Sequence, residues 1–349
     1  MHNCVYIGHV SLCIDGPCSY HLFIPPLYLS LSLINLVASL DFLLSTSWDY
    51  ELPTSTTVDY QSWLPDWINQ CKKAPLITQV PPVARNIHTP LNYSAWCYFL
   101  QGETDRELVQ FFLQGISQGF HVGFSYDTCA IHPATKNLQC AYSHPQVVEE
   151  YLRTEVITSR VAGPFCQSAI SGVHISRFGV IPKSHQPNKW RFIVDPSHPK
   201  HHSINNGVPS SLCSIHYITI EDAVQKIMAL GPGTMMAKID IKSAFRLIPV
   251  HPTDRHLLGM RWKDYTFVDT CLPFGLRSAP KLFNVLADLL TSVLTRQGVT
   301  FVLHYLDDFL TLGPPASNIC QQNLNIIQKV CGSLGIPLAL EKIEGPATI

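Results

Sequence analysis

Two neighbouring acids, Asp307 and Asp308, are the residues of this chain most suited to metal binding or catalysis. They lie between two apolar runs, residues 299–306 and 309–312, a pattern that predicts a strand, a tight turn and a second strand with both acids at the tip. Adjacent carboxylates disfavour each other's ionisation, and a hard divalent cation such as Mg²⁺ between them relieves that cost. The ordinary alternative is turn chemistry, because Asp is common in turns.

A third acid, Asp240, stands near the end of a short apolar segment, residues 235–241, which predicts a strand. Residues 242–246 then predict a turn that enters a short helix. If this strand meets the hairpin, the carboxylates converge on a pair of metal ions. Two metals about 3.5–4 Å apart clamp the attacking and leaving oxygens of a phosphoryl displacement, which depends mainly on positioning and charge neutralisation. The alternative for Asp240 is a solvated residue at a strand end.

Four segments in this order resemble the motifs of reverse transcriptases. Residues 240–245 (DIKSAF) resemble the first catalytic motif, and residues 272–280 (LPFGLRSAP) are similar to the "LPFG…AP" motif. Residues 305–308 (YLDD) are similar to the "YxDD" box, and residues 189–195 (KWRFIVD) to the "WR…VD" strand of the fingers. The resemblance covers about residues 160–349, and the four motifs together are far more specific than any one of them.

Among these polymerases the chain is most similar to those of LTR-type retroelements. Residues 195–199 (DPSHP) and 203–207 (SINNG) resemble the DIRS-type, tyrosine-recombinase retrotransposons, and depart from the "D-Y-R-x-L-N" continuation common elsewhere. The resemblance implies an α+β fold, the fingers and palm of a right-hand polymerase with helices packed on an antiparallel sheet. It also implies an RNA-directed DNA polymerase that adds deoxynucleotides from dNTPs to a primer 3′-hydroxyl on an RNA or DNA template.

The resemblance assigns the catalytic metal site to three acids. Asp240, Asp307 and Asp308 would hold two Mg²⁺ ions, with Mn²⁺ as the substitute ion, and the backbone carbonyl of Ile241 would be a further ligand.

The resemblance also assigns residues to the incoming nucleotide. Lys183 and Arg191 would contact the triphosphate, where an Arg fork suits phosphate geometry and a Lys acts as a point charge. Lys342 would match the late lysine that protonates the leaving pyrophosphate. The alternative for Lys183 is an ordinary solvated loop lysine.

Three further residues would surround the sugar and the template. Phe245 stands five residues after Asp240, where the family has a bulky ring that excludes a 2′-hydroxyl; its alternative is a core aromatic, the commoner position of Phe. Phe274 and Gly275 would lie against the nucleotide and template. Gly275 permits close backbone approach or a positive φ, and its alternative is a plain turn glycine.

Composition separates the chain into two halves of opposite charge. The net charge of the 349 residues is −1, which combines −7 over residues 1–150 with +6 over residues 151–349, the half that holds the motifs. A positive surface is what binding to a phosphate backbone requires.

The 12 cysteines include no CxxC pair. This favours a reducing compartment, cytoplasmic or nuclear and not secreted, and predicts no structural zinc.

The chain divides into four expected regions. Residues 1–50 are predicted to be an apolar leader without function. The apolar stretch at 22–44 contains Pro and polar residues, and no Lys or Arg precedes Lys72, so the sequence argues against a membrane span. Residues 51–95 are predicted to be a linker and residues 96–160 a helical extension before the fingers. Residues 161–349 would form the fingers and palm, with thumb and RNase H absent, as in a fragment or a decayed copy.

Periodicity and capping signals predict the main elements. Thr104 has capping-box spacing with Glu107. The predicted helices run from Thr104 to near Gly119, from Pro145 onward, from a cap at Thr219 to Leu230, and over 278–298 and 319–334. The predicted strands are a pair at 173–182 and 190–194 and a hairpin of 257–262 with 265–270. From Met235 onward this order suits helices on one face of an antiparallel sheet.

Two other functional interpretations stay open. A catalytically silent retroelement remnant would bind nucleic acid or a protein partner without synthesis. An RNA-dependent RNA polymerase would share the palm and the paired acids, although Phe245 and the Tyr305-Leu306 pair favour DNA synthesis. Oligomeric state and template preference are not indicated by the sequence.

Overall fold

A computed structural model describes residues 60–72, 86–126, 131–134, 136–166, 172–183 and 189–348. The expected leader, residues 1–50, lies outside this range. The helices are α2 (Tyr60–Cys71), α3 (Tyr93–Phe99), α4 (Arg106–Gln118), α5 (Gln139–Ser143), α6 (Pro145–Ile157), α7 (Ile204–Gly207), α8 (Ile220–Leu230), α9 (Ala279–Arg296) and α10 (Ile319–Leu334), with 3₁₀ turns η3 (Ser210–Cys213), η4 (Ala244–Leu247), η5 (Arg255–Leu257) and η6 (Leu340–Lys342). Within the described residues, none of these helices has the length and apolarity needed to cross a membrane.

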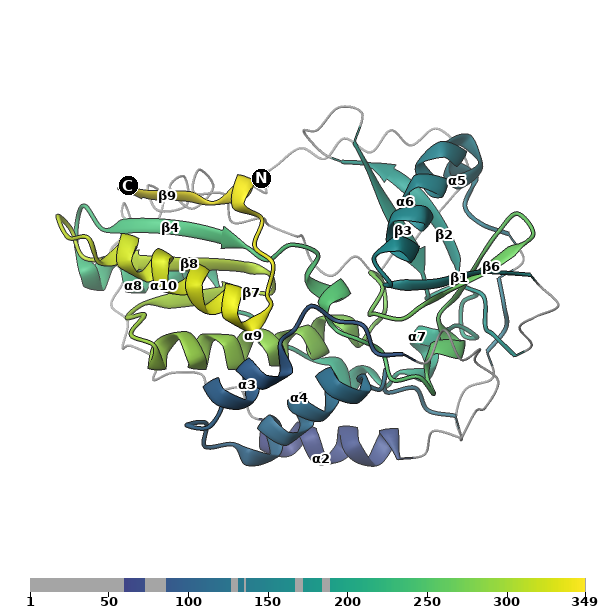
Figure 1. The fold of residues 1–349 in the computed structure, drawn as a ribbon, viewed down its shortest axis with the longest axis horizontal. Helices are drawn as coiled ribbons and strands as arrows, with labels where there is room; N and C mark the ends of the chain where they lie inside the picture. Colours follow the sequence, from purple (N-terminus) through teal and green to yellow (C-terminus); the bar gives the residue numbers. More distant parts are fainter. Residues whose placement is uncertain are drawn as a thin grey trace, which may run out of the picture.

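The strands form three antiparallel sheets, so the fold is α+β as expected. The strands are β1 (Val161–Cys166), β2 (Arg177–Pro182), β3 (Trp190–Asp195), β4 (Met235–Asp240), β5 (Gly259–Trp262), β6 (Tyr265–Asp269), β7 (Val302–Tyr305), β8 (Asp308–Gly313) and β9 (Glu344–Thr348). Their orders are β1-β6-β5, β2-β3 and β7-β8-β4-β9. Figure 1 shows the four-stranded sheet on one side of the molecule and the two smaller sheets, with α5 and α6, on the other.

The four-stranded sheet is covered differently on its two faces. Ala237, Ile239 and Phe309 belong to the main hydrophobic core, together with the apolar faces of α9 and α10. Because side chains alternate along a strand, Met236 and Leu310 point the opposite way, and they pack with α8. The helices after Met235 therefore lie on one face, as predicted, and α8 covers part of the other.

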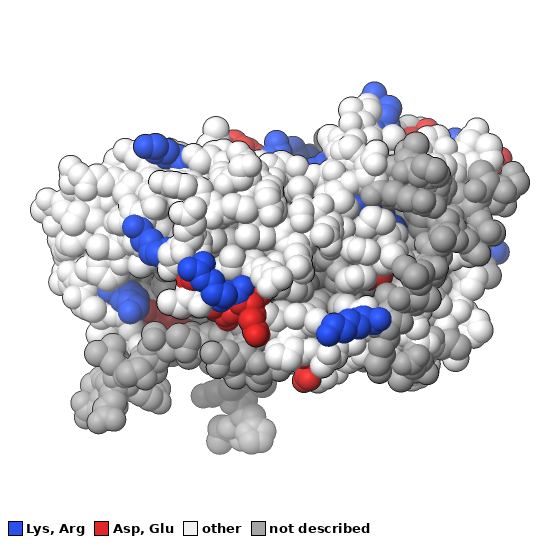
Figure 2. All heavy atoms as spheres, turned by 60° about the horizontal axis from the view of Figure 1, so that its bottom comes forward, with Lys and Arg blue, Asp and Glu red and all other residues white. Residues whose placement is uncertain are grey.

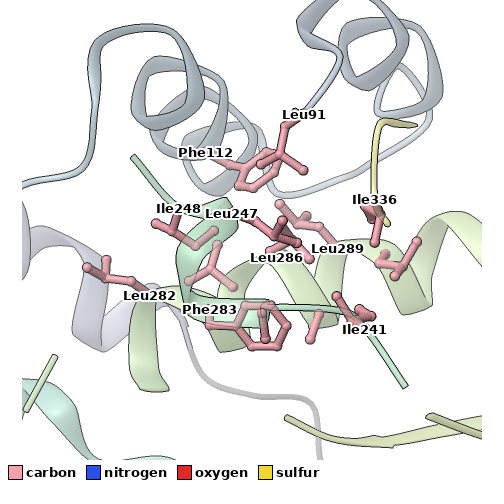
Figure 3. Packing of buried hydrophobic residues seen from close by; sticks show 14 of the residues in the cluster. Leu91, Phe112, Ile241, Leu247, Ile248, Leu282, Phe283, Leu286, Leu289 and Ile336 are labelled. Atoms are coloured by element: carbon pink, nitrogen blue, oxygen red, sulfur yellow. The ribbon is translucent and has the colours of Figure 1, made fainter. Parts of the chain in front are cut away.

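The segment that follows β4 is anchored in the main core. Figure 3 shows Ile241, Leu247 and Ile248 lying beside Phe283 and Leu286 of α9. Each of these side chains is at most 2% exposed. The end of β4, where Asp240 stands, therefore rests on a well-packed support.

The predicted linker contains a helix that belongs to the same core, so that interpretation of residues 51–95 was wrong for this part. Trp63 and Trp67 of α2 are 7% and 1% exposed, and Trp63 donates a hydrogen bond from Nε1 to the Leu212 carbonyl at 2.6 Å. Pro65 lies inside the helix and concealed it in the sequence, because Pro removes a helical hydrogen bond. Burial of the two indole rings offsets that loss. In Figure 1, α2 lies outermost, below α3 and α4.

Other boundaries differ in small ways. The N-cap of α4 is Asp105, whose side chain accepts from the Leu108 N–H at 2.9 Å, and not the predicted Thr104. Strand β2 begins at Arg177, because the preceding Ile175 forms an isolated bridge to Gly259 instead. The helices predicted from Pro145 and at 319–334 are confirmed, and so is the capping box of α8 between Thr219 and Asp222.

Candidate active site

The register of the four-stranded sheet brings the acids together. Asp240 at the end of β4 is the direct partner of Asp308 at the start of β8. Residues paired in this way have Cα atoms about 4.5–5.5 Å apart and side chains on the same face. Asp307 lies in the turn between β7 and β8, and its carbonyl accepts the Ile241 N–H at 2.9 Å. The predicted hairpin is confirmed, and the three acids lie at one end of the sheet.

Both turns at this end hold non-glycine residues with positive φ. Leu306, in the hairpin turn, has φ 53°, and Ser243, which follows β4, has φ 57°. This conformation is costly for such residues, and it concentrates at functional sites. The Leu306 side chain is 5% exposed and belongs to the main core. Its burial holds the turn in place, and the two acids follow it directly in the chain.

Burial and neighbouring charges raise the pKa of both acids of the hairpin. Burial raises the pKa of Asp307 to about 7, and the charges of Asp308 and Asp240 add to the effect. Burial also raises the pKa of Asp308, with a contribution from Asp240, while Lys238 opposes the change. The acids therefore carry repulsion that a neighbouring cation lowers.

Two lysines supply positive charge at this point. Lys238 Nζ lies 3.1 Å from Asp308 Oδ1, and Lys342 Nζ lies 3.0 Å from Asp240 Oδ2. Sequence reasoning missed Lys238, although its position two residues before Asp240 on a strand places both side chains on one face. Lys342 was expected at the leaving pyrophosphate, and the structure pairs it with a carboxylate of the acid cluster.

The donor set fits a hard cation in kind. Three carboxylates and the Ile241 carbonyl are all oxygen ligands, which Mg²⁺ prefers. Over the part of the chain that the structure describes, however, no three His, Cys, Asp or Glu side chains are arranged so that they could hold a metal ion. The carboxylates of Asp240 and Asp308 are engaged by lysines, so a bound cation would have to compete with two ammonium groups.

The basic residues predicted to contact the triphosphate lie at one end of the β2–β3 hairpin. Arg191 is the register partner of Ile181, and the Lys183 N–H donates to the Lys189 carbonyl at 2.8 Å. Burial lowers the pKa of Lys183, and the neighbouring charges of Arg191, Lys189 and Lys342 lower it further. Lys183 therefore lies close enough to Arg191 and to Lys342 to feel their charges, and Lys342 in turn is paired with Asp240.

Phe245 is mainly a core residue. It is 3% exposed, and its ring centroid lies 5.8 Å from that of Phe283. Its ring centroid also lies 5.1 Å from that of Phe274, whose side chain is 38% exposed. Most of the Phe245 side chain is therefore buried in the core, as its alternative interpretation predicted. Its contact with Phe274 connects it to an exposed aromatic ring.

Gly275 has the positive φ that its prediction allowed. Its φ is 92°, and a Cβ atom there would lie 2.5 Å from the Val194 carbonyl oxygen of β3. The close approach is therefore between two parts of this chain. Asn205 holds the same turn from both sides, because its Nδ2 donates to the Gly275 carbonyl at 2.9 Å and its Oδ1 accepts the Arg277 N–H at 2.8 Å. Nothing in the sequence pattern identified Asn205.

The charged side chains are unevenly distributed over the surface. Figure 2 turns the lower side of Figure 1, where α2 and α4 lie, toward the reader. Most of the described surface in this view is uncharged, and its basic side chains are scattered and partly mixed with acidic ones. This side lacks the gathered positive charge that a phosphate backbone requires.

Comparison with known proteins identifies one family over the region that holds the acids. Residues 181–346 match the family described as "Reverse transcriptase (RNA-dependent DNA polymerase)". The Transposon Tf2-3 polyprotein of Schizosaccharomyces pombe is 29% identical over 111 residues, which are 32% of this chain and 8% of that polyprotein. The Gag-Pol polyprotein of Baboon endogenous virus is 29% identical over 113 residues, 30% of this chain and 6% of its length. The chain therefore spans a small part of these relatives.

Two solved structures with low sequence identity to this chain were found by comparison of backbones. The foamy viral protease-reverse transcriptase in complex with an RNA/DNA hybrid is 14% identical, with a TM-score of 0.46 over 85% of this chain and 35% of that one. The Prototype Foamy Virus Protease-Reverse Transcriptase CSH mutant is 16% identical, with a TM-score of 0.47 over 62% of this chain and 26% of that one.

Proposed function

We propose that this chain, whose residues 181–346 form a reverse transcriptase domain with relatives among retroelement polyproteins, is the core of an RNA-directed DNA polymerase. It would transfer dNMP from a dNTP to the 3′-hydroxyl of a primer on an RNA or DNA template. The single observation that carries this proposal is the register of β4 and β8, which pairs Asp240 with Asp308 beside Asp307.

In this proposal the three acids form the metal site. Asp240, Asp307 and Asp308 supply carboxylates, and the Ile241 carbonyl supplies a further oxygen ligand. Two Mg²⁺ ions, when bound, supply the charge neutralisation that the attacking and leaving oxygens need. The chain holds these ligands through the paired strands and through the Ile241–Asp307 backbone hydrogen bond.

The basic residues near this cluster bind the nucleotide phosphates. Lys183 and Arg191 approach from the β2–β3 hairpin and contact the triphosphate. The side chain of Lys342 is 55% exposed, so its ammonium group has room to leave Asp240 and donate a proton to the pyrophosphate. Phosphoryl transfer depends largely on such positioned positive charge.

The aromatic pair forms the sugar side of the site. Phe245 and Phe274 are in ring contact, and Gly275 follows directly in the turn held by Asn205. We assign the exclusion of a 2′-hydroxyl to the edge of Phe245 that faces Phe274, because the rest of its ring is covered by the core.

A second candidate function is a catalytically silent remnant that only binds nucleic acid or a partner. The observation that favours it is the engagement of Asp240 and Asp308 by lysines, without a three-ligand group in the described residues. The two candidates differ in whether added Mg²⁺ or Mn²⁺ produces synthesis.

A primer-extension assay tests the proposal. The full chain is incubated with a primed homopolymer RNA template, the matching dNTP and Mg²⁺ or Mn²⁺, beside the variants Asp308→Asn and Asp264→Asn. Because metal-mediated charge stabilisation is worth several kcal/mol, Asp308→Asn should lower incorporation by about 10³-fold. Asp264 is exposed in the β5–β6 turn, so Asp264→Asn is the matched control and should leave the rate unchanged.

Equal incorporation by Asp308→Asn and wild type would contradict the assignment. Template binding without product, at any divalent metal concentration, would favour the silent remnant.

Three finer assignments complete the proposal. On residues 203–207 we propose a DIRS-type origin, which a tyrosine recombinase encoded in the same transcript would support and an integrase there would contradict. We propose that residues 96–160 are an extension of the fingers with a structural role. On the scattered cysteines without CxxC spacing, we propose that the protein acts in a reducing compartment, the cytoplasm or nucleus.

A further inference from the structure

Arg246, the residue directly after Phe245, is a buried charge that the proposed chemistry does not use. Its side chain belongs to η4 and is 4% exposed. Arginine is almost never this deeply buried without partners. It has two acidic partners that are themselves buried, Glu155 of α6 and Asp269 of β6, at 5% and 2% exposure.

The guanidinium group is held from several directions. Its Nη2 lies 2.9 Å from Glu155 Oε2, and its Nη1 lies 2.7 Å from Asp269 Oδ1. Its Nε also donates to Glu155 Oε2 at 3.0 Å. The planar fork of arginine suits such multidentate contacts, and lysine does not reproduce them.

The same group also bonds three backbone carbonyls. Nη2 donates to the Arg160 carbonyl at 3.0 Å, and Nη1 lies 3.3 Å from the carbonyls of Cys271 and Leu272. Arg160 precedes β1, and residues 271–272 lead into the turn that carries Phe274. One side chain therefore joins the Asp240–Phe245 segment to helix α6, to the start of β1 and to the Phe274 turn.

This arrangement connects both rings of the proposed sugar site. Phe245 is the neighbour of Arg246 in the chain, and Phe274 follows two residues after Leu272. The two rings are in contact at 5.1 Å between centroids. A change in the guanidinium contacts would shift one ring relative to the other.

We propose that Arg246 is a positioning residue that sets the spacing between Phe245 and Phe274, and through it the discrimination between deoxyribonucleotides and ribonucleotides. The inference rests on the proposed function, because it presupposes that a nucleotide binds beside these rings. Arg246 itself does not touch the nucleotide.

The test compares Arg246→Lys with a matched buried arginine. Arg255 of η5 is 0% exposed and donates to the carbonyls of Val250 and Asn86, each at 2.9 Å. Arg255→Lys should therefore destabilise the core without moving the aromatic pair. Glu155→Gln is a milder second variant, which keeps the guanidinium and weakens one partner, and it serves if Arg246→Lys does not fold.

The first readout is the ratio of incorporation efficiencies for dTTP and UTP. Because an ångström-scale displacement costs up to about a hundredfold, we expect Arg246→Lys to lower this ratio by roughly tenfold to a hundredfold, with a higher KM for dTTP. Glu155→Gln should shift the ratio in the same direction, and Arg255→Lys should leave it at the wild-type value. An unchanged ratio in Arg246→Lys and Glu155→Gln would overturn the inference.

The second readout does not depend on activity. Amide hydrogen exchange of the full chain should be faster at residues 243–248 and 271–276 in Arg246→Lys and Glu155→Gln, whereas Arg255→Lys should affect residues 250–258. Wild-type exchange at the first two segments in both variants would overturn the inference by itself. If the wild-type chain extends no primer, the proposed polymerase fails, and faster exchange would then retain only the structural part of the inference.

Discussion

At the scale of single residues, the site is a balance of like and unlike charges. Asp307 and Asp308 destabilise each other's charged form, and Lys238 and Lys342 compensate only part of that repulsion. Natural proteins retain such unfavourable groups where function requires them, at a cost in stability. The acid cluster should therefore affect stability and activity in opposite directions.

Asp307→Asn should stabilise the metal-free protein in a pH-dependent way. The pKa of Asp307 is raised to about 7 in the folded chain from its ordinary value of 3.8, so folding takes up a proton between these two pH values. Its stabilising contribution is fully present below the lower value and is lost as pH rises through about 7. We expect the variant to raise Tm by a few degrees at pH 8 and not at pH 4, measured by calorimetry with EDTA. A Tm difference independent of pH would contradict this, and exposed Asp264→Asn is the control.

Phe245→Ala should relax discrimination against ribonucleotides. Removing the ring opens space beside Phe274, and we expect the dTTP-to-UTP preference to fall by roughly tenfold or more. Because Phe245 is also buried, the same change should cost about 3–5 kcal/mol of unfolding free energy. Phe283→Ala, which removes the buried ring on the other side of Phe245, should have a similar cost and leave the preference unchanged. Unchanged discrimination in Phe245→Ala would remove this residue from the sugar site.

At the scale of elements, short turns decide how the site is assembled. The two-residue turn of Leu306 and Asp307, the turn at Ser243 and the turn at Gly275 all contain positive φ values. Each is held by contacts from another segment: the main core for Leu306, the Pro337 carbonyl that accepts the Lys242 N–H beside Ser243, and Asn205 for Gly275. These turns need partners distant in sequence because their own conformations are unfavourable.

Asn205→Ala should destabilise the chain through the Gly275 turn. The change leaves the Gly275 carbonyl and the Arg277 N–H without their side-chain partner, and each lost hydrogen bond costs about 0.5–1.5 kcal/mol. Urea denaturation should show the loss as a lower midpoint. Asn325→Ala, at an exposed position of α10, should stay within about 0.5 kcal/mol of wild type. A loss no greater than that of the control would mean that the turn holds without Asn205.

At the scale of the whole molecule, the first described helices share a hydrophobic core with the sheet that carries the acids. Trp67 of α2 and Phe112 of α4 belong to the same buried cluster as α9 and the strand that carries Asp240. In Figure 1, α3 and α4 lie between α2 and the region of α9. Structural support for the strand that carries Asp240 therefore comes in part from α2 and α4.

Binding of the incoming dNTP should depend on salt and should involve Lys183. Salt screens the attraction between an exposed ammonium group and a triphosphate. Lys183→Gln should weaken dNTP binding to the full chain with a primed template by roughly tenfold, because a hydrogen bond to a charged group is lost. Lys329→Gln, on the exposed side of α10, should leave the affinity at the wild-type value. Fluorescence anisotropy of a labelled dNTP between 50 and 300 mM KCl measures the affinity and its salt dependence, and an unchanged affinity for Lys183→Gln would exclude it from the triphosphate contacts.

Much of the secondary structure was predictable because it depends on local signals. The capping box at Thr219, Pro145 at a helix start and the alternation in β4 each act over a few residues, and all three elements form where expected. The helix α2 was missed because Pro65 is locally unfavourable and only the distant core stabilises it. The N-cap shifted from Thr104 to Asp105 because both residues can cap, and packing selected one.

The sequence by itself determined which acids are present, the hairpin turn at Asp307 and the motifs that indicate a polymerase, because each of these depends on residues adjacent in the chain. Only the tertiary structure decided that Asp240 pairs with Asp308, that Lys238 and Lys342 occupy their carboxylates, and that Arg246 joins two segments of the site. Such contacts join residues far apart in the chain, and their strength comes from burial and from geometry. Neither exists before the core has formed.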